Sequence, residues 1–166
     1  NQVSEGNFTA NISEDWSIGQ TANGGYSMAL LAKACSKYLE HKDPLVLSAN
    51  YIDRVDFGPA EIEVSKIATT KSTSSASVSL RQKGILKIFS TVTFTDFSKM
   101  SGLNDNLRQA PDFESYENCI QIPYKEGFNP KLDKNLEKKY CSDSIWWEKS
   151  DDKNDAVLKL FMGWKD

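Results

Sequence analysis

The feature that most constrains this fold is a change of hydrophobic period after Asp43-Pro44. Before it, residues 24–39 carry apolar side chains at helical spacing and on nearly every side, which is typical of a buried helix. After it, apolar and polar residues alternate through residues 45–52, 60–68, 73–82 and 85–95. Such alternation is typical of antiparallel strands with one buried face.

The order of these elements predicts an α+β fold. A short alternating segment over residues 7–13 predicts a first strand, and Asn23 is a good N-cap for the helix that follows. The remaining strands are joined by short turns such as Gly58-Pro59 and Lys83-Gly84. Because one apolar helix needs cover, we expect a curved antiparallel sheet wrapped around one long buried helix.

The pattern ends near Phe97, so we predict a boundary there, with one domain over residues 1–98 and a different segment over residues 99–166. In the second segment we expect strands at residues 119–124 and 156–164 and a weak helix at residues 131–140. The aromatic residues of this segment are interpreted as core packing or as the lining of an apolar pocket or interface: Trp146, Trp147, Phe161 and Trp164.

Charge and hydropathy exclude two classes of partner. The net charge is −3, from 20 Lys+Arg and 23 Asp+Glu, so no basic surface for nucleic acid is expected. The longest nearly apolar run, Met28 to Cys35, contains Lys33 and is shorter than the ~20 residues that a membrane-spanning helix needs.

The cysteine and histidine content predicts neither a disulfide framework nor a metal or cofactor site. Cys35, Cys119 and Cys141 are widely separated and lack zinc-ligand spacing, so we interpret them as reduced thiols, with Cys35 in the core. His41, the single histidine, lies in a charged stretch and is expected to be exposed, which argues against a histidine-based triad.

Four segments together resemble the thioesterase-superfamily hot-dog proteins, and most closely the acyl-CoA thioesterase II-like group with two hot-dog repeats. They are WSIGQTANGGYSMALLAKA at residues 16–34, DPLVLSANYI at 43–52, GPAEIEV at 58–64 and SLRQKG at 79–84. The segments occur in the family's order and spacing. The resemblance therefore implies a hot-dog fold for the first domain.

The second part of the chain matches less of that family. The segment Met162–Asp166 is similar to a Gly-Trp segment early in the family's second hot-dog repeat. The resemblance thus implies a linker and the start of an incomplete second repeat over residues 99–166. It also implies a catalytic Asp on the second repeat's helix, with Thr and Gln helpers, at positions expected after Asp166.

The predicted helix start offers chemistry that suits a thioesterase. A helix N-terminus has unpaired N–H groups with partial positive charge, and glycine lets a ligand approach the backbone closely. Fixed donors stabilise the oxyanion formed from a thioester carbonyl. Gly24 and Gly25 are therefore candidate catalytic residues, with Asn23 and Tyr26 as candidate substrate-binding residues. The alternative is that Gly24-Gly25 only allows tight helix packing.

No residue of the chain takes over the water-activating role by resemblance. Asp53 and Asp56 follow a strand and are interpreted as solvated loop charges rather than site groups, and Gln82 as an ordinary polar residue at a strand end. Turnover is therefore expected only if the full protein supplies the missing acid.

The sequence thus predicts an acyl-CoA thioesterase-like hydrolase of fatty acid metabolism that cleaves a fatty acyl thioester to free acid and CoA. The alternative is a non-catalytic acyl-binding or scaffolding hot-dog protein. Expected partners are acyl-CoA or another acyl thioester and a second hot-dog unit, in cis or as a homo-oligomer partner. A cytoplasmic location is expected from the reduced thiols, with the peroxisome as the alternative.

Overall fold

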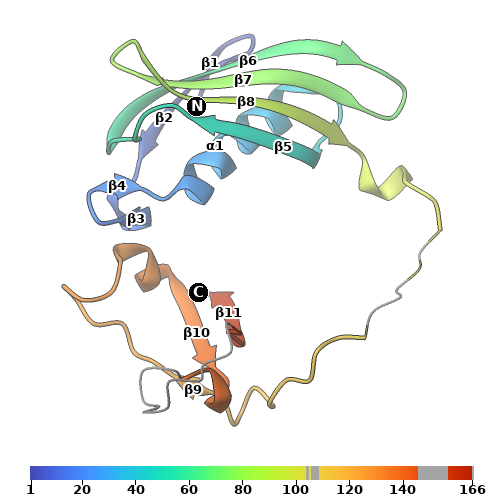
Figure 1. The fold of residues 1–166 in the computed structure, drawn as a ribbon. Coiled ribbons are helices and arrows are strands. Elements are labelled where there is room, and N and C mark those ends of the chain that lie inside the picture. Colours follow the sequence, from blue (N-terminus) through green and yellow to red (C-terminus); the bar gives the residue numbers. More distant parts are fainter. Residues whose placement is uncertain (104, 106–108, 146–156, 166) are drawn as a thin grey trace. The chain divides into compact units, whose positions relative to one another are not determined.

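The computed structural model describes residues 1–103, 105, 109–145 and 157–165. It divides the chain into two compact units, Asn1–Gly102 and Leu103–Asp166, each of which is described by itself (Figure 1). That the second unit begins another hot-dog repeat stays a prediction. Within the described residues, no helix combines the length and the apolar character needed to cross a bilayer.

The first unit is built on one six-stranded sheet in which every neighbouring pair is antiparallel. The strand order is β1-β2-β6-β7-β8-β5, and the sheet curves over helix α1 (Figure 1). The strands are β1 Gln2–Ser4, β2 Asn7–Ile12, β5 Asp43–Tyr51, β6 Gly58–Thr69, β7 Ser74–Gln82 and β8 Ile85–Thr95.

The alternating pattern explains why this sheet has one buried face. In β6, Ala60, Ile62 and Val64 are buried while the glutamates between them are exposed. β7 repeats the arrangement, with Val78 and Leu80 buried. The predicted strands and their inward faces are confirmed, and the sheet and helix together give the expected α+β class.

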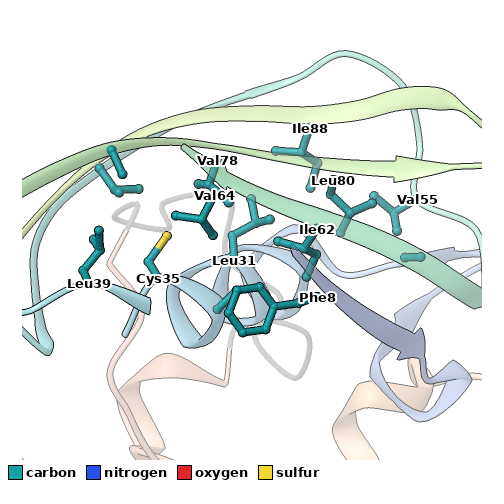
Figure 2. Packing of buried hydrophobic residues seen from close by; sticks show 14 of the residues in the cluster. Phe8, Leu31, Cys35, Leu39, Val55, Ile62, Val64, Val78, Leu80 and Ile88 are labelled. Atoms are coloured by element: carbon teal, nitrogen blue, oxygen red, sulfur yellow. The ribbon is translucent and has the colours of Figure 1, made fainter. Parts of the chain in front are cut away.

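Helix α1, Gly24–Tyr38, begins at the Asn23 cap and ends at Leu39, whose N–H donates to Cys35 O at 2.8 Å. Leu31 and Cys35 project from α1 toward β6, β7 and β8 (Figure 2), and both are fully buried. They join a core of 17 buried apolar residues. The prediction that Cys35 is a core residue is confirmed, and burial raises the pKa of its thiol to about 12.

The expectation that α1 is buried on nearly every side is wrong for this chain. Its buried helical residues are Ser27, Leu31, Ala34 and Cys35, whereas Met28 is half-buried and Ala29 is exposed. One sheet can cover only one face of a helix, so the apolar residues on the other face stay accessible.

Short elements lead into and out of this core. A 3-10 turn, η1 Glu14–Trp16, precedes a two-stranded ribbon of β3 Ser17–Ile18 and β4 Thr21–Ala22, directly before the helix. A second 3-10 turn, η2 Phe97–Lys99, follows β8. The end of η1 helps to position the first turn of α1, because Asn23 N–H donates to Trp16 O at 2.8 Å.

The second unit contains a three-stranded antiparallel sheet in the order β11-β10-β9. Its elements are β9 Ile120–Gln121, η3 Lys131–Asn135, β10 Leu136–Tyr140, η4 Ser142–Ser144 and β11 Leu160–Trp164. The predicted weak helix at residues 131–140 is half wrong, since β10 occupies its second part, where pairing with β11 overrides a weak local preference. Trp146 and Trp147 lie outside the described residues.

Candidate functional site

The start of α1 leaves two backbone donors without a partner among the described residues. A helix has four N–H groups at its start with no acceptor inside the helix. That of Asn23 donates to Trp16 O at 2.8 Å, and that of Tyr26 donates to Asn23 Oδ1 at 3.1 Å. The first intrahelical bond runs from Ser27 N–H to Asn23 O. The remaining two groups are those of Gly24 and Gly25.

Both glycines also lie in close packing contact with neighbouring side chains. A Cβ at Gly24 would lie 3.3 Å from the Tyr51 ring, and one at Gly25 would lie 3.1 Å from Asn23 Oδ1. The packing interpretation of Gly24-Gly25 therefore has direct support in the first unit. It does not exclude the donor interpretation. The packing contacts concern the Cβ position of each glycine, whereas the candidate donors are the backbone N–H groups.

Tyr51 is a site residue that the sequence does not single out. Its hydroxyl donates to Gly24 O at 2.7 Å and so attaches the end of β5 to the first turn of α1. Partial burial raises the pKa of Tyr51 above its ordinary value, so it stays a neutral donor at physiological pH. Only the fold brings these residues together, 27 positions apart.

A hollow of about 490 Å³ opens beside this first turn. It is lined by β4, by Gly24 and Ser27 of α1, and by the end of β5 with residues 52–55. Its volume is in the usual range of ligand sites, ~300–1,000 Å³. The structure therefore places one of the two candidate glycines directly at the wall of a hollow.

Asn23 and Tyr26 are engaged in the structure of the helix start. Asn23 caps the helix through its side chain. The Tyr26 ring stacks on Trp16, with ring centroids 5.7 Å apart, and its hydroxyl accepts a hydrogen bond from Ser13 N–H at 3.2 Å. Neither residue lines the hollow, so a substrate-binding role for them stays a prediction.

The acidic groups nearest to the hollow are paired with a buried lysine. Lys87 is 5% exposed, and its Nζ lies 2.7 Å from Asp53 Oδ2 and 3.6 Å from Asp56 Oδ2. The hydrogen bond from Lys87 holds the pKa of Asp53 below its ordinary value, and Asp53 raises the pKa of Lys87. The interpretation of Asp53 and Asp56 as solvated charges thus misses a shared ion pair, because Lys87 is 34 residues from Asp53.

Gln82 holds the chain that follows this wall and is more than an ordinary polar residue. It is 5% exposed, accepts a hydrogen bond from Asp56 N–H at 2.9 Å and donates to Asp56 O at 2.8 Å. It also donates to Pro59 O at 3.3 Å. Gln82 therefore holds the chain between Asp56 and Pro59 by backbone contacts that strand alternation does not reveal.

His41 has no place in this arrangement. It follows the other end of α1, which a rise of ~1.5 Å per residue places about 20 Å from Gly24. The expectation that it is exposed is wrong, since it is half-buried with Nδ1 2.8 Å from Ser74 Oγ and Nε2 3.3 Å from Lys71 O. Its contacts support a structural role at the far end of the sheet.

A family profile described as the acyl-CoA thioesterase N-terminal domain matches residues 12–95, just over half of the chain. The thioesterase-like protein TwmA of Talaromyces wortmannii is 28% identical over 88 residues, which are 51% of this chain and 25% of that protein. The profile spans the helix start, the hollow and all of β5–β8.

Two solved structures show the same fold. A hot-dog protein of unknown function from Alicyclobacillus acidocaldarius superposes with a TM-score of 0.80 at 17% identity, over 95% of this chain and 57% of that one. A protein of Thermobifida fusca described as a candidate thioesterase II gives 0.74 at 19% identity, over 86% and 54%. These similarities confirm the predicted hot-dog fold, and the chain spans about half the length of each structure.

Proposed function

The chain belongs to the acyl-CoA thioesterase N-terminal domain family, and from that membership we propose that it hydrolyses a fatty acyl thioester such as acyl-CoA to the free acid and CoA. The observation that carries the proposal is the pair of N–H groups at Gly24 and Gly25, which have no acceptor among the described residues, with Gly24 at the wall of the hollow. The thioesterase-like relative TwmA and the hot-dog fold are consistent with it.

The two donors suit the charge that thioester hydrolysis creates. Water adds to the carbonyl carbon, and the carbonyl oxygen becomes an oxyanion in the tetrahedral intermediate. The C–S bond then breaks, the acid is released and the CoA thiolate takes up a proton. Fixed N–H groups at the positive end of α1 would bind that oxyanion more tightly than the starting carbonyl, which lowers the barrier.

The base that activates water is proposed to come from a second hot-dog unit, in cis or as a homo-oligomer partner. Asp53 is already held by Lys87 at 2.7 Å, and its lowered pKa makes it a weak base. The accessible apolar residues of α1, Met28 and Ala29, offer the acyl chain a path between the first unit and the proposed second hot-dog unit.

A non-catalytic acyl-binding role is the second candidate. The observation that favours it is the pairing of both Asp53 and Asp56 with Lys87, which leaves the wall of the hollow without a free carboxylate among its described residues. In that case the Gly24 and Gly25 donors would bind an acyl carbonyl without turnover.

The experiment compares Gly24→Pro with Gly24→Ala in the full chain, supplied with acyl-CoAs of several lengths. Proline is well tolerated at the first helical position, and the extended Asn23 backbone (φ −59°, ψ 138°) suits a following proline. Gly24→Pro removes the N–H and adds bulk toward Tyr51, whereas Gly24→Ala adds a Cβ there and keeps the N–H. Free CoA is separated and quantified chromatographically.

We expect Gly24→Pro to turn over about 100-fold more slowly than Gly24→Ala, the loss that follows removal of one oxyanion donor. Equal rates for the two variants would contradict the donor role. Binding of acyl-CoA without turnover by the unmodified protein would support the acyl-binding candidate, and absence of both binding and turnover would rule out both functions.

A further inference from the structure

The second unit brings two distant cysteines into direct contact. β9 and β10 pair antiparallel with Gln121 opposite Lys139 and Ile120 opposite Tyr140. The next position in this register places Cys119 opposite Cys141. Their sulfur atoms lie 3.6 Å apart, although the residues are 22 positions apart in sequence. Both side chains are buried.

A carboxylate completes the cluster. An oxygen of Glu114 and the sulfur atoms of Cys119 and Cys141 all lie within 4.8 Å of one another. Glu114 is half-buried, and its Oε2 accepts a hydrogen bond from Ser142 N–H at 2.7 Å. That bond helps to orient the carboxylate beside the two thiols.

Few other residues are buried in the part of the second unit that the structure describes. In its described part, the buried residues are Cys119, Cys141, Ser144 and Ile145. Its β9 has two residues, and β10 and β11 have five each. Units with so small an apolar core usually need a disulfide, a metal ion or an additional partner for stability.

We propose that Glu114, Cys119 and Cys141 bind one thiolate-preferring divalent metal ion of the zinc class, with water as a fourth ligand. Zinc–sulfur bonds of ~2.3 Å at tetrahedral angles place two sulfur ligands about 3.8 Å apart. The observed separation of 3.6 Å is close to that value. Two thiolates, a carboxylate and water form a donor set that zinc accepts.

The presence of Glu114 favours a metal ion over a disulfide. A carboxylate adds nothing to a disulfide, whereas a dication is attracted by it and by the thiolates that it creates. Binding displaces one proton from each thiol, and the ion neutralises two of the three negative charges that result.

The test is titration of the reduced, chelator-treated full chain with Co²⁺, which reports thiolate ligation and tetrahedral geometry by absorption. We expect one ion per chain, a thiolate-to-cobalt charge-transfer band and strong visible bands. Stoichiometric Zn²⁺ should displace the cobalt. Cys119→Ser and Cys141→Ser should each abolish the charge-transfer spectrum of the native site.

Two further variants keep the test independent of folding. Glu114→Gln retains both thiols and an oxygen for Ser142 N–H, and it should weaken cobalt binding by at least about tenfold, the loss that follows even removal of an outer-shell partner. Cys35→Ala removes the cysteine of the first unit and should leave the spectrum unchanged. Circular dichroism of each variant checks that its secondary structure is retained.

Three results would overturn the proposal. The first is the absence of a thiolate–cobalt band in reduced protein. The second is a band that survives either serine substitution in the second unit. The third is a Cys119–Cys141 disulfide, identified by peptide mass, that re-forms after reduction in a protein with no affinity for Co²⁺ or Zn²⁺.

Discussion

At the scale of single residues, polar side chains hold backbone segments of the first unit in place. Gln82 contacts the backbone at Asp56 and Pro59, and the Tyr51 hydroxyl contacts the backbone at Gly24. Each contact joins segments that are far apart in sequence. These segments therefore depend on polar side-chain contacts as well as on apolar packing.

Gln82→Ala should lower the free energy of unfolding by about 1–3 kcal/mol, because partly buried backbone groups of Asp56 lose their partners. Urea denaturation followed by circular dichroism measures the change. Gln20→Ala is the matched control, since Gln20 is exposed and such surface changes usually stay within about 0.5 kcal/mol. Equal stability of the two variants would show that water replaces the Gln82 contacts at no cost.

At the scale of elements, an ion pair links the end of α1 to β6. Glu40 follows the helix, and its Oε1 lies 2.6 Å from Lys66 Nζ, while Thr69 Oγ1 donates to Glu40 Oε2 at 3.1 Å. The hydrogen bond from Lys66 lowers the pKa of Glu40 from 4.5 to about 2. The folded state therefore favours the ionised carboxylate of Glu40 more strongly than the unfolded chain does.

The contribution of Glu40 to stability should depend on pH in a defined direction. A lowered folded-state pKa stabilises the fold fully above pH 4.5 and loses its effect as pH falls toward about 2. The stability difference between the unmodified chain and Glu40→Gln should therefore be largest near neutral pH and should disappear in acid. Urea midpoints measured across this range test it.

Glu63→Gln provides the control for this prediction. Glu63 is an exposed carboxylate on β6, and no ion pair joins it to another described residue. Its removal should change stability little at any pH. High salt should narrow the Glu40 difference, since the pair is at the surface and screened by ions. A stability difference between the unmodified chain and Glu40→Gln that stays constant down to pH 2 would contradict an electrostatic origin.

At the scale of the whole molecule, the first unit has an accessible apolar edge. β5 ends the six-stranded sheet, and Leu45, Val46 and Tyr51 on it are exposed. An exposed strand with apolar side chains is a ready surface for pairing with another chain. The proposed second hot-dog unit would cover this edge and the accessible face of α1.

Val46→Lys should therefore weaken self-association of the chain. An unpaired charge at an apolar contact is costly, and a loss of ~1.4 kcal/mol corresponds to a tenfold higher dissociation constant. Analytical ultracentrifugation over a range of concentrations measures it. Ile67→Lys places the same charge on an exposed residue of β6 and should leave association unchanged. A monomer at all concentrations, or equal effects of the two substitutions, would exclude β5 as the contact.

Much of the first unit is predictable because its signals are local. The Asn23 cap is read from one residue type beside a helical pattern, and β6 from the alternation of Ala60, Ile62 and Val64 with glutamates. Gly24 and Gly25 can be proposed as donors for the same reason, since their position in the first turn follows from the cap. Where the sequence pattern is weak or short, secondary structure is predicted wrongly, as for β10, which lies inside a segment expected to be helical.

The sequence by itself determined the curved sheet, the central helix and the position of its first turn, because hydrophobic period and capping act between near neighbours. Only the tertiary structure decided that Tyr51 meets Gly24, that Lys87 holds Asp53, and that Cys119 meets Cys141. Those contacts depend on strand register and on loop closure over 22 to 34 residues. Register is set by the packing of whole faces, so no local pattern specifies which distant polar groups become partners.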